Sequence, residues 1–188
     1  MSTAALPRHK LTVTDYHRMV RAGILTGDDH LELIEGDLIE MAPAGPAHAD
    51  LVAHIARIMR TQTTFLVREE KPVTLPEHSE PEPDIALVKP RRYRDAHPYP
   101  IDVLMIIEVA DTSLDKDKGV KVPLYARFRI PEVWIVDVPG RAVECFWHLP
   151  VGAESTQYIG SKRAERDLIT SKTISGITLD LDELWKGS

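Results

Sequence analysis

Apolar residues in the middle of the chain gather in near-continuous runs and do not alternate with polar ones. The clearest runs lie at 85–88, 103–109 and 133–138. Such short runs are typical of strands that are covered on both faces in the centre of an α/β sheet. We therefore predict a central sheet with helices packed against it.

Three other segments of the chain are expected to be helical. Apolar residues recur at helical intervals between His48 and Met59. A short helix is expected near the N-terminus, with Thr14 as its cap, running toward Ala22 and Gly23. A third helix is expected to start near Val120, because Pro123 is tolerated only in a first turn, and to end near Arg129.

Shorter patterns predict the remaining elements. Apolar residues on both sides of Glu35-Gly36-Asp37 indicate a hairpin over 31–41. Further strands are expected at 65–68, 72–75, 142–149, 157–159 and 168–169, with a terminal turn at 182–185. The chain has 188 residues and shows no internal repeat, so we expect one domain over 11–188 behind a flexible tail, 1–10.

Composition narrows the class of protein. The net charge of −6 argues against a protein that coats nucleic acid, but a nuclease can concentrate carboxylates at a metal site. The single cysteine, Cys145, excludes an internal disulfide framework and fits a reducing compartment. No apolar stretch approaches the ~20 residues that span a bilayer, and residues 1–10 lack a signal-peptide core. We expect a cytoplasmic protein without a membrane segment.

Two acids stand at the ends of apolar runs. Asp84 follows Pro83 and opens one run, and Glu108 falls late in the next. On adjacent strand ends their carboxylates could reach one Mg²⁺ ion, and the Val109 carbonyl could add a third oxygen. The alternative for Glu108 is a salt bridge to a lysine or arginine in the core, because a buried carboxylate is costly without a partner.

A lysine follows these acids on the next predicted helix. Lys121 and Tyr125 are four residues apart and so share one helix face. A lysine beside two metal-binding carboxylates can orient a water and steady developing negative charge, which suits metal-assisted hydrolysis of a phosphodiester. The alternative is a surface ion pair between Asp117 and Lys121.

Other charged residues have two open interpretations. Glu32 could point into the site as a third acid or face water. His48 could contact phosphate, although a helix-capping or surface role is favoured. A cluster of basic residues after the first acid could grip a phosphate backbone or form an ordinary solvated face; it consists of Lys89, Arg91, Arg92 and Arg94.

Three motifs resemble the Uma-two-type family of "putative restriction endonucleases", which belongs to the PD-(D/E)XK nuclease superfamily. They read Glu-Leu-Ile-Glu-Gly-Asp at 32–37, Pro-Asp-Ile-Ala at 83–86 and Ile-Glu-Val-Ala-Asp-Thr-Ser-Leu at 107–114. The last motif continues through Asp117, Lys121, 123–126 and 130–137. The resemblance extends from Thr12 to Trp185.

This resemblance implies a restriction-endonuclease-like α/β fold, with a central mixed β-sheet flanked by helices. It implies Asp84 and Glu108 as metal ligands and Glu32 as the acid contributed near the N-terminus. In most of the superfamily the lysine lies two residues after the second acid, where this chain has Ala110. The family supplies that lysine from the following helix, which corresponds to Lys121.

The leading hypothesis is therefore an endonuclease that hydrolyses DNA with Mg²⁺, for which Mn²⁺ can substitute. Asp84 and Glu108 would hold the metal, Lys121 would position the attacking water, and Tyr125 and Glu32 would support them. Cutting both strands of a duplex would favour a homodimer. The alternative hypothesis is a non-catalytic nucleic-acid-binding or structural module that retains the nuclease fold.

Overall fold

The computed structural model describes residues 8–148 and 156–186, so most of the predicted tail lies outside the described residues. The chain divides into two compact units. The first comprises residues 1–43 and 74–81, and the second comprises 44–73 and 82–188. The expectation of a single domain stays a prediction.

The first unit opens with a capped helix. Helix α1 (Val13–Arg21) begins after Thr12, whose hydroxyl accepts a hydrogen bond from the Asp15 N–H while the Asp15 carboxylate accepts one from the Thr12 N–H. This reciprocal pair is a capping box. The prediction of Thr14 as the cap was wrong, because Thr12 is the residue with the extended backbone that precedes the first turn.

The predicted hairpin is present in the first unit. Strand β1 (Leu31–Ile34) pairs antiparallel with β2 (Asp37–Glu40), and a short 3-10 turn, η1 (Gly27–Asp29), precedes them. The two connecting residues, Glu35 and Gly36, both have positive φ, at 49° and 80°. Positive φ at both central positions is the geometry of the tight hairpin turn that a right-handed strand twist prefers.

The second unit is built on a mixed sheet. Within the described residues, β5 and β6 run parallel and the other neighbouring strands run antiparallel. The strand order equals the order along the chain: β3 (Leu66–Glu69), β4 (Ile85–Val88), β5 (Val103–Ala110), β6 (Glu132–Asp137), β7 (Ala142–Trp147) and β8 (Gly160–Ala164). The near-continuous apolar runs are the three strands at the centre, as the sequence predicts.

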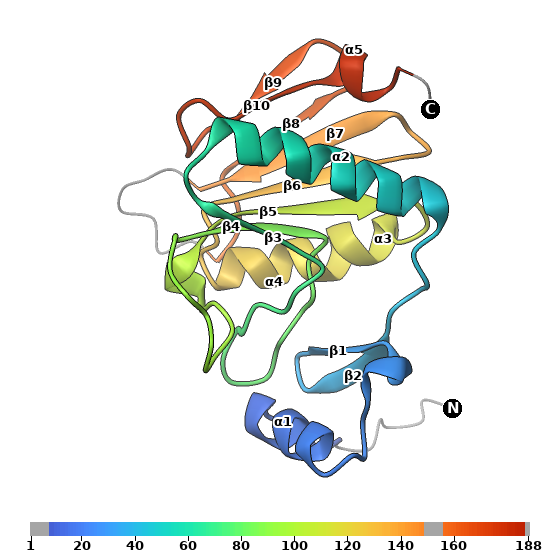
Figure 1. Cartoon of the computed structure of the whole chain (residues 1–188), viewed down its shortest axis with the longest axis vertical. Coiled ribbons are helices and arrows are strands. Elements are labelled where there is room, and N and C mark those ends of the chain that lie inside the picture. The colour runs from blue at the N-terminus through green and yellow to red at the C-terminus, as the bar shows by residue number, and fades with distance from the viewer. Residues whose placement is uncertain (1–7, 149–155, 187–188) are drawn as a thin grey trace, which may run out of the picture. The chain divides into compact units, whose positions relative to one another are not determined.

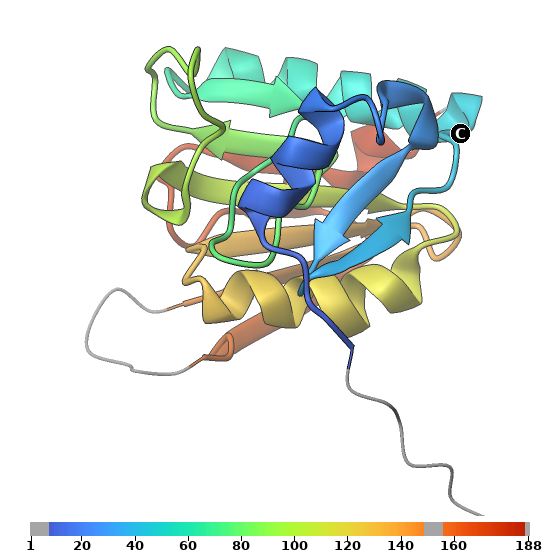
Figure 2. The same cartoon turned by 90° about the horizontal axis from the view of Figure 1, so that it is seen from below.

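Helices cover both faces of this sheet. Helix α2 (Pro46–Gln62) lies along one face, and the helical stretch made of α3 (Leu114–Lys116), η3 (Asp117–Lys121) and α4 (Val122–Arg127) lies along the other (Figure 1, Figure 2). Ile55 and Met59 of α2 join the core with Met105 and Ile107 of β5. Since strand side chains alternate, Glu108 points to the opposite face, toward α4.

Two strands that the sequence predicted are absent. No strand forms at 72–75, between β3 and β4, or at 157–159. In the C-terminal part, β8 begins at Gly160, and β9 (Leu168–Thr170) pairs with β10 (Thr178–Asp180). Strand β8 is largely exposed and polar at the edge of the sheet, so it lacks the apolar pattern of the central strands. The terminal helix α5 (Leu181–Leu184) buries Leu184 and Trp185, as predicted.

Candidate active site

The pairing of β4 with β5 brings the two predicted acids together. Ile85 lies opposite Ile107, so the same antiparallel register continued by one residue places Asp84 across from Glu108. The backbone N–H of Val109 donates a 2.6 Å hydrogen bond to Asp84 Oδ2. Asp84 lies just before β4 begins, so its carboxylate is at the end of the strand pair, beside Val109 and close enough to Glu108 to affect its pKa.

Glu108 is held by the two helix residues that the sequence placed on one face. The Tyr125 hydroxyl donates a 2.6 Å hydrogen bond to Glu108 Oε1. The Lys121 amine lies 3.2 Å from Oε1 and 3.3 Å from Oε2. The salt bridge considered as an alternative for Glu108 therefore exists, and its partner is Lys121 itself.

The carboxyl group of Glu108 lies in an unusual electrostatic environment. It is 2% exposed, and burial raises its pKa to about 8. The Lys121 amine opposes this rise, and the carboxylates of Asp117 and Asp84 add to it. A carboxyl group of this kind gains from a second nearby cation, because positive charge restores the stability of the ionised form.

Asp117 is a member of the cluster that the sequence did not assign to the site. Its side chain is buried, the Ser113 hydroxyl donates to Oδ2, and Oδ1 lies 4.0 Å from the Lys121 amine. Burial raises the pKa of Asp117, and Lys121 counteracts that rise. The available signal was that Asp117 lies four residues before Lys121, but this spacing alone favoured an ion pair on the surface.

Asp84 has a second partner in the first turn of α2. His48 Nε2 lies 3.1 Å from Asp84 Oδ1, and this hydrogen bond raises the pKa of His48 against the effect of burial. The two oxygens of Asp84 are thus engaged by His48 and by the Val109 N–H. The favoured capping or surface role for His48 was wrong, because α2 starts at Pro46 and carries the ring over the start of β4.

The remaining predicted site residues have different surroundings. Glu32 lies in β1 of the first unit, where it pairs with Ile39. It is buried, so the alternative that it faces water was wrong, and its role in the site stays a prediction. The four basic residues Lys89, Arg91, Arg92 and Arg94 lie exposed in the segment after β4. Arg91 forms an ion pair with buried Asp102 and stacks 5.0 Å from the ring of Tyr93.

The donor set suits a hard divalent cation. Asp84 and Glu108 offer carboxylate oxygens, and Val109 offers a carbonyl, which are the ligand types of Mg²⁺. Over residues 8–148 and 156–186, no group of three or more histidine, cysteine or acidic side chains is arranged to hold a metal. A Mg²⁺ ion would therefore keep several waters, as it commonly does when one or two carboxylates bind it.

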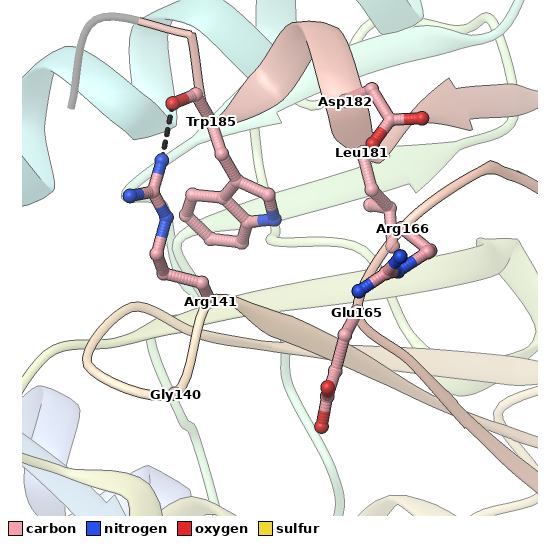
Figure 3. A pocket seen from close by; sticks show the side chains of 7 residues that line it. All are labelled: Gly140, Arg141, Glu165, Arg166, Leu181, Asp182 and Trp185. Carbon is pink, nitrogen blue, oxygen red and sulfur yellow. Dashed lines mark hydrogen bonds between the residues drawn. The ribbon is translucent and has the colours of Figure 1, made fainter.

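A pocket of about 380 Å³ lies elsewhere in the second unit (Figure 3). Its lining includes the turn between β6 and β7 and the C-terminal helix, and Arg141 donates a hydrogen bond to the Trp185 carbonyl on one side of it. None of the predicted site residues lines this pocket.

In the described part of the chain, no helix is long and apolar enough to cross a membrane.

A six-stranded mixed sheet flanked by helices, with two acids on a neighbouring strand pair, agrees with the restriction-endonuclease-like class of nuclease folds that the sequence resemblance implied. The chain belongs to the family described as "Uma2: Putative restriction endonuclease", whose model matches residues 13–182. The family resemblance and the fold that it implied are thereby confirmed.

Solved structures give the same fold. The crystal structure of a "putative nuclease" from Anabaena variabilis is similar to this chain, with a TM-score of 0.68 and 15% sequence identity. The similarity covers 94% of this chain and 98% of that one. Among curated proteins, none matches this chain.

Proposed function

We propose that the chain is an endonuclease that hydrolyses phosphodiester bonds of DNA with the help of Mg²⁺. The observation that carries this proposal is the meeting of Asp84, Glu108 and Lys121 at one end of the β4–β5 pair. Membership of a family of restriction endonucleases supports the nuclease class and suggests DNA as the substrate.

Asp84 and Glu108 are the residues that would hold the metal. Bound there, Mg²⁺ would polarise the phosphoryl oxygens and lower the pKa of a bound water. The chain itself keeps both carboxylates in place, because the Val109 N–H orients Asp84 and the Tyr125 hydroxyl orients Glu108. These supporting hydrogen bonds fix the direction of the lone pairs that a cation needs.

Lys121 is the residue that would act on the attacking water. Its amine sits against Glu108 and carries three donors, so it can hold a water by a hydrogen bond and stabilise negative charge on the phosphoryl group. The lysine is buried at 5% exposure, which strengthens its electrostatic effect relative to an exposed amine. Lys89, Arg91, Arg92 and Arg94 would contact phosphates without reading sequence.

Nicking of supercoiled plasmid tests the proposal directly. We expect wild-type protein to nick with Mg²⁺ or Mn²⁺ and to lose that activity with chelator. Asp84→Ala and Lys121→Ala should lower the rate at least about 100-fold, because each removes a group that acts on the reacting phosphate. Asp115→Asn, an exposed acid on the same helical stretch, is the matched control and should cut like wild type.

A second candidate function is a nucleic-acid-binding module that keeps the fold without catalysis. Two observations favour this module: the net charge of −6, and the salt bridge by which Lys121 and Glu108 already neutralise each other. Calorimetric titration with Mn²⁺ separates the two candidates. Binding that disappears in Asp84→Ala supports the nuclease, whereas a folded protein that neither binds Mn²⁺ nor nicks DNA supports the module.

A further inference from the structure

The buried lysine of the site lies between two carboxylates. Its amine is 3.2 Å from Glu108 Oε1 and 4.0 Å from Asp117 Oδ1, and all three side chains are at most 6% exposed. The two acids come from different elements, since Glu108 is in β5 and Asp117 begins η3. The closer acid is also the one that the proposed function assigns to the metal.

Pairing with the Lys121 amine and binding a metal ion compete for the charge of Glu108. A carboxylate that coordinates a divalent cation shares its charge with that cation and attracts a neighbouring ammonium less strongly. A buried ammonium that loses its main counter-charge is strongly destabilised. The second carboxylate beside the Lys121 amine, that of Asp117, therefore gains importance whenever Glu108 binds a cation.

Asp117 is built to supply that charge. The Ser113 hydroxyl donates to Oδ2 and leaves Oδ1 on the side of the lysine. The turn from Asp117 to Lys121 is a π-helix, closed by a hydrogen bond from the Val122 N–H to the Asp117 carbonyl. A π turn contains one more residue than an α turn, costs stability, and occurs frequently at functional sites.

The sequence explains why the wide turn occurs at this position. Pro123 has no N–H and cannot make the hydrogen bond to Gly119 that an α-helix would require. The backbone widens before it and resumes α geometry at Val122. This arrangement keeps Asp117 and Lys121 on the inner side of one helical stretch, and both are buried.

We propose that Asp117 is a positioning residue that holds the Lys121 amine when Glu108 binds a divalent cation. Asp117 touches neither metal nor phosphate in this role and acts through the lysine. The inference deepens the proposed function and rests on it, because the exchange of partners matters only if Glu108 is a metal ligand.

Acylation of Lys121 tests the proposal without any metal. Wild type and variants are treated with an acetylating reagent in chelator, and peptide mass spectrometry gives the rate at Lys121, with exposed Lys89 as the internal reference. The Glu108→Gln substitution removes the charge of residue 108 and so imitates a Glu108 whose charge is neutralised by a bound cation. We expect its Lys121 rate to stay within about threefold of wild type, because Asp117 retains the amine.

The double variant Glu108→Gln with Asp117→Asn should then react about tenfold faster or more, since the carboxylates 3.2 Å and 4.0 Å from the amine have both lost their charge. Glu108→Gln with Asp115→Asn is the matched control and should behave like Glu108→Gln alone. A single Glu108→Gln variant that already reacts as fast as the double variant would overturn the proposal. Circular dichroism reports whether each variant is folded.

The single variant Asp117→Asn gives a second readout if the double variant does not fold. Its Lys121 rate should rise about tenfold when saturating Mg²⁺ replaces chelator, whereas wild type should hardly change. In nicking assays its kcat should fall about tenfold with KM for DNA nearly unchanged. An unchanged acylation rate with Mg²⁺ bound would refute the role of Asp117. If the wild-type protein binds no cation, the proposed function is refuted instead. The acylation rates of Glu108→Gln and of the double variant in chelator would still show whether Asp117 holds the Lys121 amine.

Discussion

Burial changes the chemistry of single residues in this protein, and Cys145 shows this away from the site. Its side chain lies in the core, where burial raises the pKa of the thiol to about 12 from an ordinary value of 9.0. Glu132 adds to the rise. Because only the thiolate is a nucleophile, the cysteine of the native protein should be inert.

The pH dependence of Cys145 labelling follows from the direction of this shift. Because burial raises the pKa of the native thiol well above 8, the thiol should be almost entirely protonated at pH 8, and Ellman's reagent should react very slowly. Unfolding in guanidinium should give one rapidly reacting thiol, and that sample is the control. Rapid, stoichiometric reaction of the folded protein at pH 8 would contradict the buried position.

Elements of the second unit are joined by a buried carboxylate. Glu132, at the start of β6, accepts hydrogen bonds at Oε2 from the N–H groups of Lys172 and Thr173 and from the hydroxyls of Ser171 and Thr173. Its Oε1 accepts one from the Trp134 indole. The segment between β9 and β10 is thus fastened to the central sheet by one side chain.

Glu132→Gln should destabilise the fold by about 2–4 kcal/mol, because an amide NH₂ would replace an oxygen among several donors and leave them without an acceptor. Urea unfolding monitored by tryptophan fluorescence measures the change. Glu165→Gln, which alters an acid with a 67% exposed side chain, is the matched control and should shift stability by no more than about 0.5 kcal/mol. Equal urea midpoints for the two variants would show that Glu132 does not stabilise the contact between the 171–173 segment and the central sheet.

At the scale of the whole molecule, the proposed metal site couples cation binding to folding. A cation that binds the folded chain alone should stabilise it by about 2.7 kcal/mol at 100 times its Kd. Thermal unfolding should therefore shift upward when Mg²⁺ replaces chelator. The shift should vanish in Asp84→Ala, and the same shift in that variant would place the cation elsewhere. The homodimer and the cytoplasmic location stay predictions.

Much of the architecture was readable from local patterns. The central strands, α2 and the hairpin turn at Glu35-Gly36 follow from apolar runs, helical spacing and turn chemistry, which neighbouring residues set by themselves. Strand β8 was missed because it has no apolar pattern. It is a strand because it pairs with β7. The cap of α1 was misplaced by two residues because both candidates are threonines.

The sequence by itself determined the chemical inventory of the site: two acids at strand ends, a lysine four residues before a tyrosine, and an overall acidic chain. Only the tertiary structure decided how these groups meet. The register of β4 against β5 sets Asp84 across from Glu108, and the helical stretch over that face brings Lys121, Tyr125 and Asp117 into the same buried cluster. The physical reason is that strand register and helix packing are long-range properties, whereas sequence patterns report mainly on residues close along the chain.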